Sequence, residues 1–156
     1  MTAPLGTFCL VLHTHLPWLA HHGRWPVGEE WLHQAWAQSY GPLLEMLARL
    51  GDQGHRDLLT IGVTPVLAAQ LDDPYCLREH HRWLADWLLR ADDLSGQRDA
   101  TLRRLGVHES RQARQALERF EAGWSGGGSP VWRSLADAGV VELLGGPATH
   151  PVLPLV

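Results

Sequence analysis

The segment His13-Thr14-His15, which ends an unbroken apolar run, places the strongest constraint on how this chain folds. The run covers residues 8–12, Phe-Cys-Leu-Val-Leu, and Pro17 follows shortly after the second histidine. A short, continuous apolar run predicts a strand that is buried on both faces, as in a parallel sheet covered by helices. Because Pro17 cannot donate a ladder hydrogen bond, we expect the strand to stop near it.

His13 and His15 are the first candidates for a functional site. Side chains alternate along a strand, so the two imidazoles point to the same side, together with Cys9 and Val11. They therefore converge at the carboxyl end of a strand, where α/β barrels and open α/β sheets place their sites. Alternatively, one histidine is a hydrogen-bonded core residue and the other is incidental. For a same-face pair at a strand end we favour a functional role.

The segment that follows, residues 18–28, is rich in glycine, proline and aromatic residues, which predicts a loop. It leaves the carboxyl end of the first strand, and loops in that position often carry binding residues. Trp25, between Arg24 and Pro26, is the best candidate for an exposed aromatic residue. From its position alone, an equally good interpretation is that Trp25 folds back as a hydrophobic plug.

Two further apolar runs, residues 58–63 and 140–144, predict a second and a third strand. Helical patterns lie between the strands, and this alternation is typical of the βαβ units of a parallel sheet. The third predicted strand is followed by a polar loop that carries His150. Residues 91–107 are charged and are expected to be irregular, with helix in part. The predicted helices cover residues 29–40, 42–50, 66–71, 74–89, 113–120 and 131–138.

Two details of these elements favour structural roles. Glu142 lies inside the third apolar run, and a buried carboxylate needs a partner, so we expect an ion pair with an arginine. Trp83 and Trp87 are spaced four apart on a helix, which favours helix–helix packing over ligand stacking.

The number of strands indicates the architecture. Three strands cannot close a barrel, and an open three-stranded parallel sheet would leave two unprotected edges. The simplest inference is that the chain forms the opening part of a larger (β/α) barrel, with histidine-bearing loops at two of the three carboxyl ends.

Composition excludes several classes of function. The formal net charge is −4 and the 13 basic residues form no basic stripe, so nucleic acid is not an expected partner. The two cysteines, Cys9 in the buried run and Cys76, are too few for a disulfide framework and fit a reducing compartment. The N-terminal apolar stretch is too short for a signal peptide or a membrane span. We therefore expect a cytoplasmic protein with no membrane partner and no cofactor.

Four blocks of sequence together resemble glycoside hydrolase family 57, and within it the 1,4-α-glucan branching enzymes. The first block begins Leu-Val-Leu-His-Thr-His-Leu-Pro-Trp at residue 10 and continues through residue 30. The others, in the same order and spacing, are residues 37–44, 61–67 and 148–150. The resemblance implies that residues 1–156 are the N-terminal portion of an incomplete (β/α)7 barrel. It also implies a retaining reaction on α-glucans, which needs two carboxylates about 5 Å apart.

The same resemblance implies roles for the candidate residues. His13 would line the subsite where the covalent glucosyl intermediate forms, with His150 close to it, and Trp25 would stack on a glucose ring. His15 would bind substrate or only orient His13. In the family both carboxylates lie on later strands, a Glu in a Trp-x-Pro-Glu block and a downstream Asp, and neither block is present in residues 1–156. We therefore assign no catalytic residue and expect these residues to need the remainder of the barrel for activity.

Two other functions compete with this interpretation. A metal-dependent hydrolase or deacetylase would use His13 and His15 as zinc ligands, with His150 as the third. Against it, no Asp or Glu occupies a comparable strand end. A non-catalytic carbohydrate-binding fragment fits the eight tryptophans and the missing carboxylates.

Overall fold

The computed structural model describes residues 6, 8–23 and 28–151 of the chain. Strands and helices alternate along it, and each of the three predicted strands is present. The order is β1 (Val11–Thr14), α1 (Glu29–Ala35), the π-helical turn η1 (Trp36–Tyr40), α2 (Gly41–Asp52), β2 (Leu59–Val63), α3 (Pro65–Asp72), α4 (Pro74–Ser95), α5 (Ala100–Arg119), the π-helical turn η2 (Phe120–Trp124), α6 (Ser129–Asp137) and β3 (Val141–Leu144). None of the described helices is long and apolar enough to cross a membrane.

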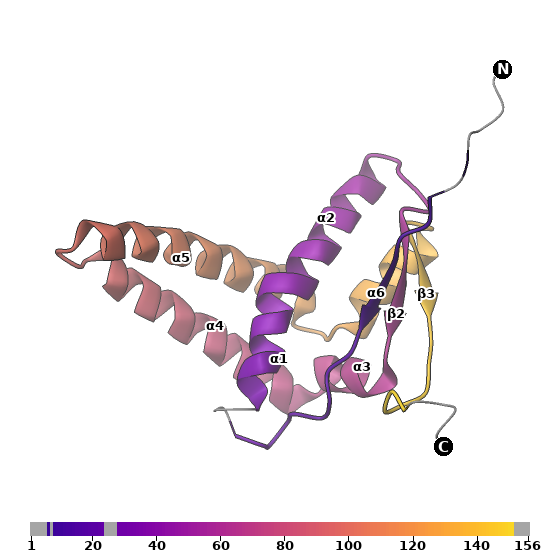
Figure 1. Ribbon diagram of the computed structural model, residues 1–156, viewed down its shortest axis with the longest axis horizontal. Coiled ribbons are helices and arrows are strands. Elements are labelled where there is room, and N and C mark those ends of the chain that lie inside the picture. The colour runs from indigo at the N-terminus through magenta and orange to yellow at the C-terminus, as the bar shows by residue number, and fades with distance from the viewer. Residues whose placement is uncertain (1–5, 7, 24–27, 152–156) are drawn as a thin grey trace.

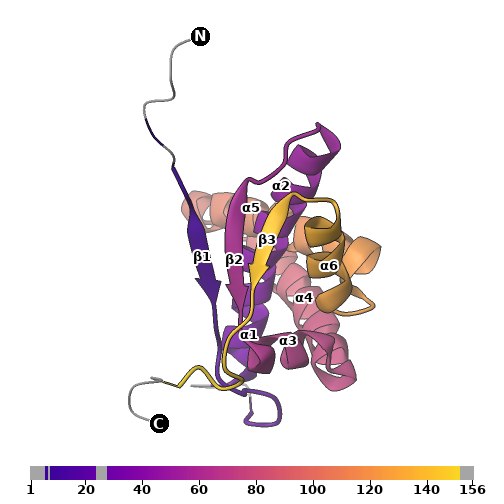
Figure 2. The ribbon, with the colours of Figure 1, turned by 90° about the vertical axis from the view of Figure 1, so that its right-hand side faces the viewer.

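The strands form one parallel sheet in the order β1-β2-β3. Its register pairs His13 with Gly62 and Gly62 with Leu144. Figure 2 shows the three strands side by side with the helices behind them. The predicted arrangement of three parallel strands with intervening helices is therefore confirmed.

The core lies between the sheet and the helices of that single layer. Ile61, in the central strand, is fully buried, because helices pack on this face of the sheet. Leu32 and Trp36 from the first helical segment and Leu44 from α2 belong to the same buried cluster. The apolar stripe of the first helical segment and α2 faces this interface.

The other face of the sheet is uncovered in the described residues, so the expectation of strands buried on both faces is wrong there. Strand alternation places Val11 and Leu144 on that face, and their side chains are 58% and 44% exposed. Cys9, expected in a buried strand, is also exposed. One layer of helices can bury only one face of a sheet, whereas an apolar run predicts two buried faces.

Glu142 also differs from its prediction. The residue is exposed, and its Oε2 accepts a hydrogen bond from the hydroxyl of Thr60 at 2.9 Å. It lies on the uncovered face beside the central strand, so its carboxylate needs no arginine to compensate for burial.

The first helical segment is continuous where a break was predicted at Gly41-Pro42. The π-helical turn η1 joins α1 to α2, and Pro42 lies in the first turn of α2, where a missing N–H is tolerated. The wider π-helical turn accommodates the loss of the hydrogen bond that Pro42 cannot donate, so the helix continues through the proline.

Helices α4 and α5 form a hairpin that extends away from the sheet (Figure 1). Residues 91–107, predicted to be irregular with helix in part, are mostly helical, because the Asp99 carboxylate caps α5 by accepting from the Thr101 and Leu102 amides. Close packing also requires Gly106, where an added Cβ would lie 2.3 Å from the Ser95 nitrogen.

Both tryptophans of this hairpin have the structural role predicted for them. Trp83 is buried and its indole N–H donates to Glu30 at 2.8 Å, which ties α4 to α1. Trp87 donates to Glu109 of α5 at 3.0 Å. Their rings lie 5.4 Å apart, so they pack within helix interfaces.

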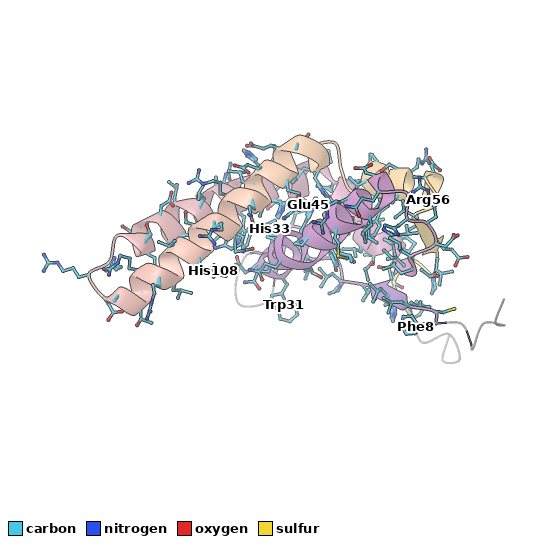
Figure 3. All side chains as sticks on the ribbon, turned by 90° about the horizontal axis from the view of Figure 1, so that it is seen from above. Phe8, Trp31, His33, Glu45, Arg56 and His108 are labelled. Carbon is cyan, nitrogen blue, oxygen red and sulfur yellow. The ribbon has the colours of Figure 1, made fainter. Side chains whose placement is uncertain are left out.

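A buried histidine, His80, lies where the hairpin meets the first helical segment. Its ring stacks on Trp36 with centroids 4.4 Å apart, and Phe120 meets it edge-on at 5.1 Å. Its Nδ1 atom is buried without a hydrogen-bond partner. Burial, with a smaller contribution from His33 and His81, lowers the pKa of His80 well below its ordinary value. His33, labelled in Figure 3, lies 5.4 Å from His80 between ring centroids.

Candidate functional site

Three histidines meet at the carboxyl end of the sheet. His13 is in β1, His15 follows the strand end, and His150 lies in the loop after β3. The centroid of the His150 ring is 4.6 Å from that of His13 and 4.7 Å from that of His15. The structure therefore brings together the three histidines selected from the sequence. Trp25, the fourth candidate, lies outside the described residues.

The central strand leaves space for His13. An added Cβ on Gly62 would lie 3.0 Å from His13 Nδ1, so a larger residue would press on the imidazole. The neighbouring Thr14 is buried on the opposite side, and its hydroxyl donates to the Gly62 carbonyl at 3.0 Å. Glycine in β2 thus has a packing reason at this position.

His15 is held by the residue that begins helix α3. Its Nδ1 lies 3.2 Å from the hydroxyl of Thr64, which is buried and occupies the N-cap position of α3. Burial, followed by the proximity of His150 and His13, lowers the pKa of His15. The ring is therefore neutral near pH 7, where one nitrogen donates a hydrogen bond and the other accepts one.

His150 reaches the other two rings from a tight backbone turn. Its φ is +56°, in the left-handed region that non-glycine residues rarely adopt. Its amide donates to the Pro147 carbonyl at 3.3 Å, and the amide of Val66 in α3 donates to Ala148 at 3.2 Å. A strained conformation persists only where its surroundings hold it, and strained residues cluster at ligand sites.

An open cavity of about 270 Å³ on the uncovered face of the sheet is lined by two of the three histidines, His13 and His150. Its volume suits one small ligand unit rather than a large cofactor. The imidazoles of His13 and His150 supply its polar side-chain groups, together with Thr64. The lining residues are Val11, Leu12, His13, Gly62, Val63, Thr64, Leu144, Gly145, Gly146, Pro147, His150 and Pro151.

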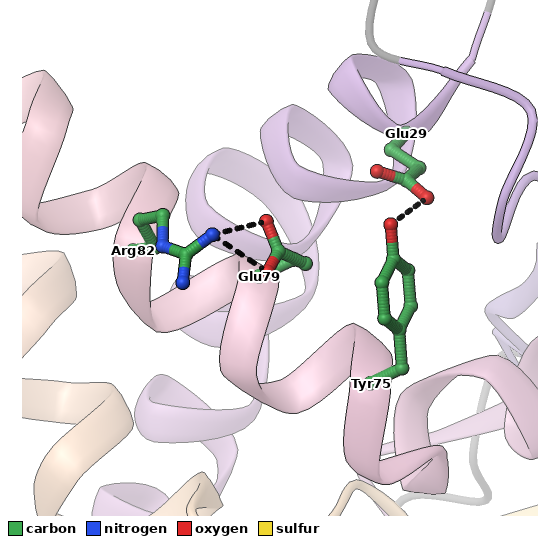
Figure 4. A network of polar contacts seen from close by, with 4 residues as sticks. All are labelled: Glu29, Tyr75, Glu79 and Arg82. Carbon is green, nitrogen blue, oxygen red and sulfur yellow. Dashed lines mark hydrogen bonds and ion pairs between the residues drawn. The ribbon is translucent and has the colours of Figure 1, made fainter.

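Two residues that no sequence pattern pointed to for the site, Gln70 and Glu29, hold the chain that follows β1. Gln70 of α3 is fully buried and bonds the backbone of Pro17 and Leu19. Glu29 is the first residue of α1. It is buried, and it accepts hydrogen bonds from the amide of His21 at 2.7 Å and the hydroxyl of Tyr75 at 2.9 Å (Figure 4).

The arrangement of the rings does not favour the zinc interpretation. The His15 and His150 rings are stacked with their planes 26° apart. Ring nitrogens bind metal along directions in the ring plane, so stacked rings do not aim them at a common point. Across residues 8–23 and 28–151, no group of three or more His, Cys, Asp or Glu side chains is arranged to hold a metal ion.

The fold and the site define a barrel-type α/β protein with its candidate ligand site at the carboxyl ends of the strands. The chain belongs to glycoside hydrolase family 57, whose family model matches residues 9–156. The family predicted from the sequence blocks is thereby confirmed.

Relatives and solved structures within the family carry a more specific description. Over 97% of its length the chain is 54% identical to probable 1,4-α-glucan branching enzymes of two strains of Mycobacterium tuberculosis, of which it covers 31%. It is 35% identical to the 1,4-α-glucan branching enzyme of Thermococcus kodakarensis, of which it covers 22%. The chain thus spans about a third or less of these relatives.

The solved structures match almost the whole chain. The branching enzyme of Pyrococcus horikoshii superposes with a TM-score of 0.86 at 38% identity, covering 95% of this chain and 28% of that one. The α-amylase AmyC of Thermotoga maritima gives a TM-score of 0.80 at 23% identity and covers 94% and 28%, which shows a shared fold. The predicted fold class, a portion of the family's (β/α)7 barrel, is confirmed by these superpositions.

Proposed function

We propose that this chain is the N-terminal part of a 1,4-α-glucan branching enzyme, which cleaves an α-1,4-glucan and transfers the released segment to form an α-1,6 branch. The observation that carries the proposal is the 54% identity to probable branching enzymes over nearly the whole chain. The substrate is then an α-glucan of the glycogen or amylose type. The histidine cluster supports the proposal, because it places hydrogen-bonding groups at the end of the sheet where a barrel binds its substrate.

In this proposal the residues of the cluster bind and orient one glucosyl unit. The imidazoles of His13 and His150 hydrogen-bond its hydroxyl groups, and His15 supports His150 by stacking on it. Trp25 stacks on a glucose face. Retention requires a nucleophilic carboxylate and an acid/base carboxylate, and we assign neither within residues 1–156. These residues form a segment of the catalytic barrel that precedes the catalytic carboxylates, and the remainder of the barrel is its partner.

The test uses the gene product at its natural length, incubated with amylose. We expect new α-1,6 linkages, measured as chains released by isoamylase and by the anomeric proton signals in NMR spectra. The variant His13→Ala should lower the rate, whereas Gln112→Ala on the exposed surface of α5 should not. New reducing ends without α-1,6 linkages would assign hydrolysis instead, and no reaction with any α-glucan would refute the proposal.

We also propose that the protein acts in the cytoplasm. The exposed Cys9 and the buried Cys76 are both free thiols, as expected in a reducing compartment. Detection of the protein in the extracellular fraction of its source cells would contradict this.

A further inference from the structure

Helix α3 contacts both histidine-bearing segments of the site. It follows β2 directly, and Thr64 at its N-cap position meets the His15 ring. Two residues further along, the Val66 amide donates to the carbonyl of Ala148, two residues before His150. Gln70, near the other end of α3, bonds the chain that follows His15. One short helix therefore fixes the positions from which two of the three imidazoles approach each other.

Gln70 is well suited to hold that chain. Its Oε1 accepts from the Leu19 amide at 2.6 Å, and its Nε2 donates to the Pro17 carbonyl at 2.9 Å. The same nitrogen lies 3.4 Å from the Val66 carbonyl in its own helix. A carboxamide presents a donor and an acceptor side by side, and it does so without having to be protonated. Gln70 thus bridges the two peptide groups on either side of Trp18.

The bridge lies where the chain turns into the core. Leu19 is 4% exposed and Ala20 is 1% exposed, so the Leu19 amide is shielded from water. A backbone amide in such a place must be hydrogen-bonded, and Gln70 supplies its acceptor. Residue 17 is only two positions after His15, so a movement of residues 17–19 also moves the His15 backbone. It would displace the ring from its place between Thr64 and His150.

We propose that Gln70 is a positioning residue of the histidine site, which holds residues 17–19 so that His15 stays against Thr64 and His150. Its effect on catalysis rests on the function proposed above, whereas its effect on the His15 ring does not. Gln70 acts through the backbone and touches no substrate. A purely structural residue would support folding without altering the state of that ring.

The test compares Gln70→Glu and Gln70→Leu with the matched surface variant Gln112→Glu, all in the gene product at its natural length. A carboxylate at position 70 faces the Pro17 carbonyl without a donor and repels it. We expect Gln70→Glu to lower kcat/KM by on the order of 10- to 100-fold, as small misplacements of binding groups do. Burial raises the pKa of the new carboxyl group, and its protonated form donates again, so activity relative to wild type should recover as the pH is lowered. Gln112→Glu should change neither kcat/KM nor its dependence on pH.

A second measurement does not depend on activity. NMR titration of the His15 ring reports its pKa, which burial and the two neighbouring histidines hold below the ordinary value. In folded Gln70→Leu we expect that pKa to rise toward its ordinary value as the ring leaves its neighbours. If the variant unfolds at a lower denaturant concentration but keeps the wild-type kinetics and His15 titration, the proposal is overturned. If the wild-type protein forms no branches, the function proposed above fails, and the titration alone decides the role of Gln70.

Discussion

His80 predicts that the protein loses stability in mildly acidic solution. Its imidazole is 1% exposed and packs against Trp36 and Phe120, and its Nδ1 has no hydrogen-bond partner. The groups that lower its pKa besides burial are His33 on α1 and His81 on its own helix, which are themselves bases. The folded state therefore keeps His80 neutral well below the pH at which an exposed histidine becomes charged.

The direction of the effect follows from this difference in proton binding. The unfolded chain titrates His80 with an ordinary pKa near 6.5. Above that pH neither state binds the proton, and the contribution of His80 to stability is fully present. Below it the unfolded state binds a proton that the folded state excludes, so stability falls until the pH reaches the depressed folded pKa. Between about pH 7.5 and pH 5 the loss from this one residue is about 2 kcal/mol.

The assay is urea denaturation followed by tryptophan fluorescence across that pH range, for wild type and His80→Phe. Phenylalanine keeps an aromatic ring for Trp36 and cannot titrate, so any packing cost is the same at each pH and cancels from the slope. We expect the variant to lose about 2 kcal/mol less than wild type between about pH 7.5 and pH 5. The exposed His108, labelled in Figure 3, offers the control His108→Gln, which should keep the wild-type slope.

A result in which His80→Phe and wild type show equal pH dependence would refute this reasoning. It would mean that the folded state accepts a proton on His80 as readily as the unfolded chain does. Partial agreement is also informative, because a slope difference restricted to the range below about pH 5.5 would indicate that the unfolded chain protects the imidazole.

Three further predictions concern single substitutions. Gly62→Val places side-chain atoms against the His13 imidazole, and we expect kcat/KM to fall by on the order of 10-fold or more while circular dichroism shows a folded protein; unchanged kinetics would contradict the packing argument. Asp99→Ala removes the cap of α5 and should lower the free energy of unfolding by about 1 kcal/mol, measured with urea, whereas Asp99→Asn should retain most of it. Glu29→Ala removes the carboxylate that accepts the hydrogen bond of Tyr75, the chief cause of the raised pKa of that phenol, so spectrophotometric titration of Tyr75 should shift to lower pH; an unchanged titration would show that burial causes the shift.

Several apolar side chains of the described residues are exposed, which is consistent with a chain that matches only part of the length of the related enzymes. Phe8 beside β1 is 87% exposed, and Val11 and Leu144 are exposed on the open face of the sheet (Figure 3 labels Phe8). The relatives are about three or more times as long as the matched segment. In the proposed enzyme, later strands of the barrel would extend the sheet and cover these side chains.

The sequence by itself determined the strands, their parallel arrangement and the family. These features depend on local signals. Apolar runs mark strands in the interior of a sheet, residues that favour loops and helices separate them, and alternation along a strand puts His13 and His15 on one side. Four ordered motif blocks added the family, because their order does not depend on how the chain is packed.

Only the tertiary structure decided which faces are covered and which residues meet. The exposure of Cys9 and Glu142 depends on the number of layers around the sheet, which no local pattern records. The helical state of residues 91–107 depends on packing between α4 and α5. The stacking of His15 on His150 and the bridge made by Gln70 join segments far apart in the chain. A single glutamine in a helix has no distinguishing local pattern, because its hydrogen-bond partners are set by the fold.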